Sequence, residues 1–218
     1  MEQVWKDPRS APQQQFRVKL TPYEGGVVMT MSNITSLVNK TAELEQLNSD
    51  LVQIANTDAL TQAQSRRHFL EHCGQETARS ARYEYDVSVI YMDIDYFKRI
   101  NDEYGHAVGD QVLIEVTSLT RSMIRDCDSF GRLGGEEFAI LLPHTELAAA
   151  VDLAARIRDR IASTLFRIQK QSFNVTCSFG VAQHEPAASV DVLLATAHAA
   201  LYEAKKTGRN RVCKAAGA

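Results

Sequence analysis

Residues 132–138, RLGGEEF, place a glycine pair between two short apolar runs, and this pattern is typical of a tight β-hairpin. Gly134 and Gly135 can adopt the positive φ values that a two-residue turn needs, and their lack of a side chain lets a large ligand approach the backbone. The pattern puts Glu136 and Glu137 at the hairpin tip. Taken alone, such a turn is more often a solvated hairpin than a functional site.

A second acidic segment follows a buried strand. The apolar run from Val87 to Met92 predicts that strand, which ends at Asp93 and leads into DIDYFKRINDEYGHAVGD. A carboxylate there, beside acids on a neighbouring hairpin, can hold Mg²⁺, which takes oxygen ligands and shares them with substrate phosphates. The segment is not an EF-hand, because Phe97 stands where a calcium loop has Asp or Asn. The chain also lacks a Walker A motif.

The rest of this region alternates helical and strand patterns, which predicts a domain of mixed α and β structure from about residue 57 onward. The patterns predict helices over about 65–83, after Gly109, over about 146–165 and over about 190–206, and a strand from Phe173 to Val181. Gly208 supplies the usual stop signal for the last helix.

Residues 1–33 form a separate segment, in which a polar stretch precedes two alternating strands around Gly25 and Gly26. This predicts one hairpin. An isolated hairpin is marginally stable in water, so we expect it to belong to a larger unit, either an upstream domain or a partner chain. The segment GGVVMTMSNIT resembles the last two strands of a PAS-type sensor domain.

Residues 34–56 predict a helix with apolar residues at the 3-4 spacing of a coiled-coil seam. The seam consists of Leu37, Leu44, Leu47, Leu51 and Ile54. We expect a parallel dimer. The alternative is that this stripe packs on its own domain, since the repeat covers only about two and a half heptads and Lys40 occupies a seam position.

Composition narrows the function classes. A formal charge of −3 argues against a DNA- or RNA-binding protein, which usually carries an excess of Lys and Arg. No apolar run approaches the roughly 20 residues of a membrane-spanning helix. The four cysteines form no CxxC pair and the chain start lacks the apolar stretch of a signal peptide, so we expect reduced thiols and a cytoplasmic protein.

The region from about Thr57 to Lys214 resembles the catalytic domain of GGDEF-family diguanylate cyclases. The resemblance rests on three motifs that occur in the family's order: DIDYFKRINDEYGHAVGD, RLGGEEF and ALYEAKKTGRNRV. The segment DALTQAQSRRHF departs from the family's usual DxLTGLxNRR, with Gln62 and Ser65 in place of Gly and Asn. The resemblance implies an α+β fold, with an antiparallel-rich central sheet flanked by helices, similar to the palm of class III nucleotidyl cyclases. It also implies condensation of two GTP into cyclic di-GMP by a homodimer.

By matching position, the resemblance implies roles for individual residues. Mg²⁺ or Mn²⁺ is expected on Asp93, the Ile94 carbonyl and Glu136. Catalysis is expected of Glu136, Glu137 and Lys98. The expected substrate-binding residues are Phe97, Asn101, His106, Asp110, Gly134, Gly135, Lys205 and Arg209. Of these, Asn101 and Asp110 would contact guanine, whose ring N–H and amino group suit a carboxylate acceptor.

The resemblance also implies a product-inhibition site. Arg125 and Asp128 form an RxxD motif five residues before Gly134, and Arg156 matches a further arginine of that site. Arginine forks suit phosphate groups and guanine edges. An ordinary surface pair remains the alternative, because RxxD is a short motif.

Two other functions compete. A domain of the same fold could bind GTP or cyclic di-GMP without turnover, although the complete acidic set with Lys98 and Lys205 argues against this; a turnover assay separates the two. The segment HFLEH, residues 68–72, matches the HxxEH pattern of zinc peptidases. Matches of five residues arise often by chance, and zinc analysis tests this interpretation.

Overall fold

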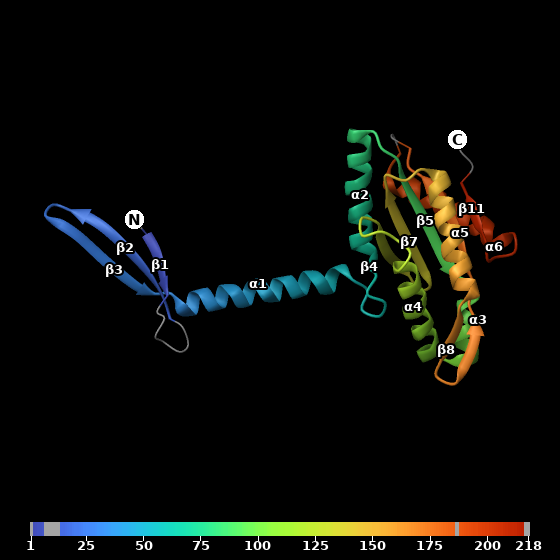
Figure 1. The fold of residues 1–218 in the computed structure, drawn as a ribbon, viewed down its shortest axis with the longest axis horizontal. Helices are drawn as coiled ribbons and strands as arrows, with labels where there is room; N and C mark the ends of the chain where they lie inside the picture. The colour runs from blue at the N-terminus through green and yellow to red at the C-terminus, as the bar shows by residue number, and fades with distance from the viewer. Residues whose placement is uncertain (1, 7–13, 186–187, 216–218) are drawn as a thin grey trace. The chain divides into compact units, whose positions relative to one another are not determined.

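The computed structural model describes residues 2–6, 14–185 and 188–215. The chain divides into two compact units, Met1–Gln53 and Ile54–Ala218 (Figure 1). Among the described residues, no helix is both long and apolar enough to cross a membrane.

The first unit contains an antiparallel three-stranded sheet. The predicted hairpin is present as β2 (Gln15–Tyr23) and β3 (Gly26–Asn33), and β1 (Glu2–Lys6) pairs with β2 as an additional strand. The alternation of apolar and polar residues did not predict β1, because this strand lies in the polar stretch at the start of the chain. Every residue of β3 is exposed, so the sheet offers no covered core along this strand.

Helix α1 (Thr35–Asn56) follows β3 and matches the helix predicted from the leucine spacing. The Asn33 side chain accepts a hydrogen bond from the Thr35 N–H at 3.0 Å, which satisfies one of the free donors at the helix start. Leu37 and Leu44 are exposed, 55% and 66% respectively. The other seam side chains, Leu47, Leu51 and Ile54, lie outside those that the structure describes.

The second unit is built on a six-stranded mixed sheet with the order β11-β10-β5-β7-β6-β4. The pairs β10–β5, β5–β7 and β7–β6 are antiparallel, and only the two outer pairs are parallel. The strands are β4 (Gln64–Ser65), β5 (Val87–Ile94), β6 (Ser129–Gly134), β7 (Glu137–Pro143), β10 (Cys177–Gln183) and β11 (Val212–Lys214). A separate hairpin pairs β8 (Leu165–Ile168) with β9 (Gln171–Asn174). The predicted antiparallel-rich α+β fold is confirmed.

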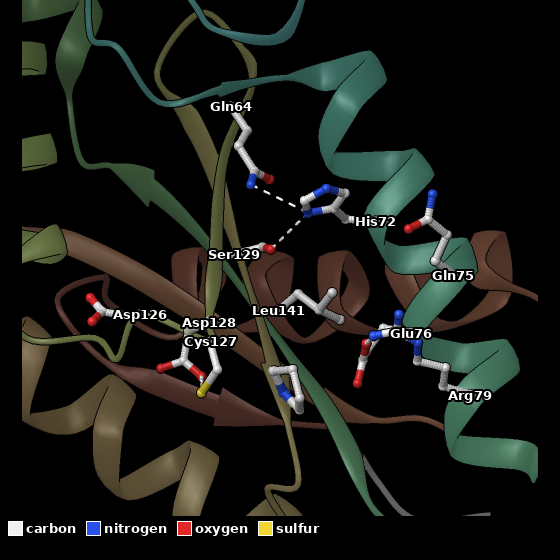
Figure 2. A pocket seen from close by; sticks show the side chains of 11 residues that line it. Gln64, His72, Gln75, Glu76, Arg79, Asp126, Cys127, Asp128, Ser129 and Leu141 are labelled. Carbon is white, nitrogen blue, oxygen red and sulfur yellow. Dashed lines mark hydrogen bonds and ion pairs between the residues drawn. The ribbon is translucent and has the colours of Figure 1, made fainter. Parts of the chain in front are cut away.

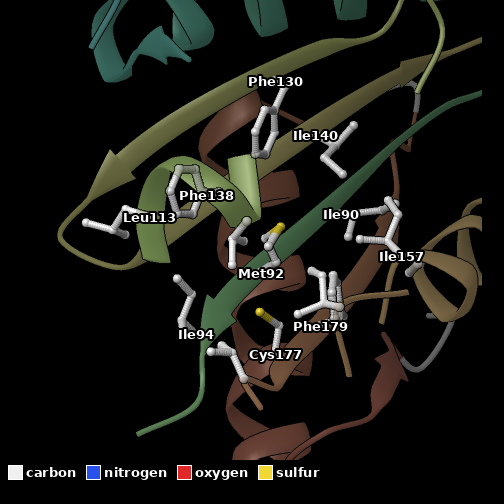
Figure 3. Packing of buried hydrophobic residues seen from close by; sticks show 14 of the residues in the cluster. Ile90, Met92, Ile94, Leu113, Phe130, Phe138, Ile140, Ile157, Cys177 and Phe179 are labelled. Atoms are coloured by element: carbon white, nitrogen blue, oxygen red, sulfur yellow. The ribbon is translucent and has the colours of Figure 1, made fainter. Parts of the chain in front are cut away.

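Helices cover both faces of this sheet (Figure 1). One face packs on α4 (His106–Arg121) and α5 (Leu147–Ser163) through Met92, Phe138 and Phe179, as Figure 3 shows. The other face packs on α2 (Arg66–Tyr83) and α6 (Val190–Lys206). Successive residues of β5 therefore enter different cores, and all eight are buried.

Two predicted elements differ in detail. The helix expected after Gly109 starts earlier, at His106, and α3 (Phe97–Tyr104) precedes it; Gly105, with φ of 86°, separates the two helices. The strand expected from Phe173 to Val181 is divided into β9 and β10 by Val175 and Thr176. β9 and β10 belong to different sheets. The alternation of apolar and polar residues cannot show this, because it has the same period of two in both strands.

Close packing of α6 on β10 fixes the position of the helix that carries Lys205. A Cβ atom on Gly180 would collide with the main chain of Ala197 and Leu201. The glycine thus lets the helix backbone lie against the strand. The observed bounds of α6, Val190–Lys206, match the prediction.

Candidate active site

Asp93 is the centre of the site. It lies near the end of β5, pairs in register with Glu137 of β7, and is buried. Directly paired residues of antiparallel strands point to the same face, so both carboxylates lie on the face that packs on α6. Lys205, in the last turn of α6, places its Nζ 2.7 Å from Asp93 Oδ2.

Burial is the largest influence on the Asp93 carboxyl and raises its pKa to about 6. Lys205 acts in the opposite direction, whereas the nearby charges of Glu136 and Glu137 raise the pKa further. Three carboxylates and one ammonium group therefore gather where β5 ends, and a further positive charge would stabilise the ionised carboxylates.

Arg132 fixes the glycine turn between β6 and β7. Its Nε and Nη2 both donate to the Gly135 carbonyl, at 2.9 and 2.8 Å, and its Nη1 lies 2.9 Å from Asp58 Oδ1. Gly135 has φ of 39°, a conformation that favours glycine. The Ile94 N–H donates to the Glu136 carbonyl at 3.4 Å, which joins the turn to the end of β5.

The carboxylate of Glu137 has two partners that the motifs did not indicate. The Tyr91 hydroxyl donates to it at 3.3 Å, and His198 Nε2 lies 3.7 Å from it. Burial and the charge of Glu137 raise the pKa of Tyr91 to about 12. Tyr91 could have been found from the sequence, since it stands two residues before Asp93 and so lies on the same face of the strand.

Four of the predicted substrate-binding residues, and Lys98, lie on α3 and α4. Phe97 is buried at the start of α3, and Asn101 lies one turn later and is half-buried. A Cβ on Gly109 would collide with the Asn101 amide oxygen, so the glycine leaves room for that amide between the two helices. Lys98, His106 and Asp110 are exposed.

Arg209 belongs to the turn after α6 and contacts Tyr96, at the start of α3. Its guanidinium carbon lies 4.5 Å from the centroid of the Tyr96 ring. The structure thus brings together Asp93, Glu136, Glu137 and Lys205, and ties Arg209 to the turn that follows Asp93.

The RxxD motif lies in the turn between α4 and β6. The Asp128 carboxylate accepts a hydrogen bond from the Arg125 N–H at 2.8 Å, so the motif has a local structural role. Burial raises the pKa of Asp128 and this hydrogen bond opposes the rise. Arg156 is an exposed residue of α5.

A pocket of about 340 Å³ opens beside this turn (Figure 2). It is lined by Asp126, Cys127 and Asp128 from the turn and by His72, Glu76 and Arg79 from α2. His72 Nδ1 lies 3.1 Å from Ser129 Oγ and 3.4 Å from Gln64 Nε2. The second histidine of the HFLEH segment therefore has hydrogen-bond partners inside the domain.

The donor set near Asp93 fits a hard divalent cation. Buried and half-buried carboxylates with a main-chain carbonyl are the oxygen ligands that Mg²⁺ takes, and Mg²⁺ completes its shell with water and substrate phosphates. Among the described residues, no three His, Cys, Asp or Glu side chains converge as a metal site. The expected set is compatible with this, because it consists of Asp93, Glu136 and the Ile94 carbonyl.

Comparisons with known proteins agree with the geometry. Residues 55–211 match the family described as "Diguanylate cyclase, GGDEF domain". The chain is 36% identical over 188 residues to diguanylate cyclase DgcP of Pseudomonas aeruginosa, covering 86% of this chain and 28% of that protein. It is 37% identical over 188 residues to a diguanylate cyclase of Vibrio cholerae, covering 86% and 56%. The chain thus spans about half or less of these relatives.

Solved structures give the same result. The coiled coil and GGDEF domain of DgcB from Caulobacter crescentus, in complex with c-di-GMP, superposes with a TM-score of 0.76 at 31% identity, covering 83% of this chain and 97% of that one. The active GGEEF domain of a Vibrio cholerae diguanylate cyclase has a TM-score of 0.67 at 37% identity, covering 71% and 98%. With its acidic site, its glycine hairpin and these matches, the chain belongs to the GGDEF family of diguanylate cyclases.

Proposed function

We propose that this chain condenses two molecules of GTP into cyclic di-GMP and releases two pyrophosphates. One observation carries the proposal: the buried Asp93 carboxylate lies beside the glycine hairpin that bears Glu136 and Glu137, with the Lys205 ammonium 2.7 Å away. Oxygen ligands for cations and a positive side chain for phosphate thus occur at one point. Family membership supports the same reaction.

Asp93, Glu136 and the Ile94 carbonyl would hold Mg²⁺ or Mn²⁺, which would supply charge neutralisation and lower the pKa of the attacking hydroxyl. Lys205 and Arg209 would bind the triphosphate, and Lys98 would add a third positive charge. The 3′-hydroxyl oxygen of one GTP attacks the α-phosphorus of the other, and pyrophosphate leaves from the opposite side. Positive side chains lower the barrier because charge develops on the leaving group.

The 3′-hydroxyl proton must leave during the attack, and Glu136 is its proposed acceptor. If Glu136 also held a cation it would be a weaker base, and the cation would then supply part of the activation. Glu137 would keep the acidic tip in place through its hydrogen bond from Tyr91. We assign Glu136 as essential on either route.

Guanine selectivity would come from the α3–α4 pair. Asp110 can accept from the guanine ring N–H and amino group, and the Asn101 amide can both donate and accept. Adenine lacks this pair of adjacent donors. Phe97 and His106 would shape the walls of the base site, while Gly134 and Gly135 allow the phosphates to approach the hairpin.

Two domains must face each other, because each is expected to present one GTP. Parallel pairing of α1 would raise the effective concentration of one domain at the other. The exposed Leu37 and Leu44, seven residues apart, support such pairing. The three-stranded sheet of β1, β2 and β3 would then belong to a PAS-type sensor unit.

Product inhibition is proposed at Arg125 and Asp128, with Arg156 contributed by a neighbouring domain. Guanidinium groups can bind both phosphates and guanine edges of cyclic di-GMP. A pocket of about 340 Å³ lies beside Asp128, and Arg79 is among the residues that line it. The crystal structure of DgcB was solved in complex with c-di-GMP.

The direct test is incubation of the purified chain with GTP and Mg²⁺, with ATP in a parallel reaction, followed by identification of the product by mass. We expect cyclic di-GMP and pyrophosphate from GTP and no cyclic product from ATP. Asp93→Asn is the inactive control. A wild-type protein that binds GTP but forms no product would instead be a nucleotide-binding module and would overturn the proposal.

A further inference from the structure

The buried Asp95 joins the turn between β5 and α3 to a turn that carries Arg209, an expected phosphate-binding residue. Its carboxylate accepts hydrogen bonds from Thr176 Oγ1 at 2.8 Å, Ser178 Oγ at 2.6 Å and the Asn210 N–H at 3.0 Å. The last of these joins the turn between β5 and α3 to the turn between α6 and β11. Arg209, which lies in the second turn, is therefore anchored next to the end of β5.

The turn after α6 has an uncommon backbone. Gly208, Arg209 and Asn210 have φ values of 123°, 60° and 45°. The left-handed region carries a steric cost for a residue with a Cβ atom, so two consecutive non-glycine residues there need support from their surroundings. Two hydrogen bonds provide that support. The Asn210 N–H donates to the Asp95 carboxylate, and the Arg209 N–H donates to the Ala204 carbonyl at 3.0 Å.

The side chain of Tyr96 contacts Arg209 in this turn. Its own backbone is left-handed, with φ of 57° and ψ of 27°, and its side chain makes no capping bond to α3. The ring is 60% exposed, yet the Arg209 guanidinium lies over it at 4.5 Å, and Arg209 Nη1 donates to the Tyr96 hydroxyl at 3.3 Å. The ring thus makes both a stacking contact and a hydrogen bond with one cation.

We propose that Tyr96 is a positioning residue that acts through Arg209, holding its guanidinium where the triphosphate of GTP binds. This inference rests on the proposed function. A long arginine side chain loses rotamer freedom when it binds phosphate, and a partner that restricts it beforehand reduces that loss. A side chain ordered in this way strengthens binding of substrate and transition state alike, so its removal raises KM more than it lowers kcat.

The test is a double-mutant cycle on the full chain. Tyr96→Ala raises KM for GTP about fivefold and changes kcat less than about twofold, as expected for loss of an exposed cation–π contact together with a hydrogen bond. Tyr96→Phe keeps the ring and raises KM only about twofold. In the Arg209→Ala background, Tyr96→Ala has little further effect, because the group through which it acts is already missing.

Tyr202→Ala is the matched control. Lys206 Nζ lies 4.8 Å from the centroid of the Tyr202 ring, which is 55% exposed, so this substitution removes a similar contact within α6, away from Arg209 and Tyr96. It leaves KM for GTP unchanged. Equal effects of Tyr96→Ala with and without Arg209 would overturn the inference, because Tyr96 would then act by another route.

Affinity for 3′-deoxy-GTP, measured by calorimetry, separates this inference from the proposed function. The analogue lacks the attacking hydroxyl, so it binds without reacting. If the wild type binds it but makes no product from GTP, the proposed reaction fails, while the same cycle in dissociation constants still decides the role of Tyr96. If the wild type binds no nucleotide, both proposals are overturned.

Discussion

Arg132 Nη1 lies 2.9 Å from the Asp58 carboxylate, although 74 positions separate the two residues in the sequence. The same guanidinium donates twice to the Gly135 carbonyl. One arginine therefore links the segment that follows α1 to the glycine hairpin. A displacement of Asp58 would therefore also displace the turn that bears Glu136.

This ion pair gives the domain a defined acid sensitivity. Burial is the largest single influence on the Asp58 pKa and raises it, but hydrogen bonds from Thr61 and Arg132 and the charge of Arg132 outweigh burial, so the pKa lies below its ordinary value. The pair thus stabilises the fold above the unfolded pKa of about 3.9, and its contribution is lost as the pH falls through the lower folded value.

Asp58→Asn should lower the free energy of unfolding by about 2 kcal/mol at pH 7, since it removes charged hydrogen bonds. The difference from wild type should shrink below about pH 4. Urea titrations at several pH values measure it. Asp159→Asn, which removes an exposed pair with Arg158, should change stability by less than about 1 kcal/mol. Equal losses in the two variants would contradict the prediction.

Burial of the Asp93 carboxylate should lower the stability of the metal-free, nucleotide-free protein at neutral pH. The pKa of Asp93, about 6, lies above its unfolded value, so its stabilising contribution is complete below about pH 4 and is lost as the pH rises through about 6. Asp93→Asn should therefore stabilise the metal-free, nucleotide-free protein by about 1–3 kcal/mol at pH 7.5.

Thermal and urea unfolding of Asp93→Asn in EDTA check this, and the gain over wild type should shrink at pH 5. Turnover should be absent in the variant. Asp95→Asn is the contrasting case, because the Asp95 carboxylate accepts three hydrogen bonds and its replacement should destabilise the fold. A less stable Asp93→Asn at pH 7.5 would contradict the argument.

The elements that depend on a local pattern of residues could be predicted from the sequence. The apolar run of β5, the glycine hairpin and the bounds of α6 follow from periodicity and turn residues, and they place Asp93 and Glu136 at strand ends. Glu137 and Asp93 could be expected close together, but their register, which makes them direct partners, is set only in the folded sheet.

Contacts between distant turns could not be predicted in this way. The Asp58–Arg132 pair and the Tyr96–Arg209 stack join segments that no local pattern relates. The start of α4 was misplaced because Gly109, taken as the residue before the helix, lies inside it and serves packing against Asn101. Tertiary contact there overrides the usual role of glycine as a helix boundary.

Gly109→Ala should weaken GTP binding by displacing the Asn101 amide, whose oxygen occupies the space of the added Cβ. We expect KM for GTP to rise about tenfold, which corresponds to about 1.4 kcal/mol, the loss of one or two hydrogen bonds to the base. Gly74→Ala is the matched control, because it is also a helical glycine but has no atom within 4 Å of the added Cβ. That control should stabilise α2 by up to about 1 kcal/mol and leave KM unchanged.

Loss of the α1 seam should lower activity at dilute protein. The double variant Leu37→Glu and Leu44→Glu places charges at two positions seven residues apart, where paired helices would bury them. Specific activity should fall about tenfold or more at nanomolar protein and recover at high concentration, because association then no longer needs the tether. Ala42→Glu, at a position facing away from the seam, is the control. Equal specific activity of all three proteins at every concentration would contradict dimerisation through α1.

Replacement of the RxxD arginine should separate inhibition from synthesis. Arg125→Ala removes the guanidinium proposed to bind cyclic di-GMP and retains the backbone N–H that bonds Asp128, so the turn should keep its shape. Added cyclic di-GMP should then inhibit the variant at least about tenfold less strongly, as expected when a charged hydrogen-bond donor to the ligand is lost. Arg156→Ala should act in the same direction, whereas Arg160→Ala, an exposed arginine one turn along α5, should not. Initial rates measured at rising concentrations of cyclic di-GMP test this prediction. If Arg125→Ala is inhibited as strongly as the wild type, the RxxD turn is not the inhibitory site.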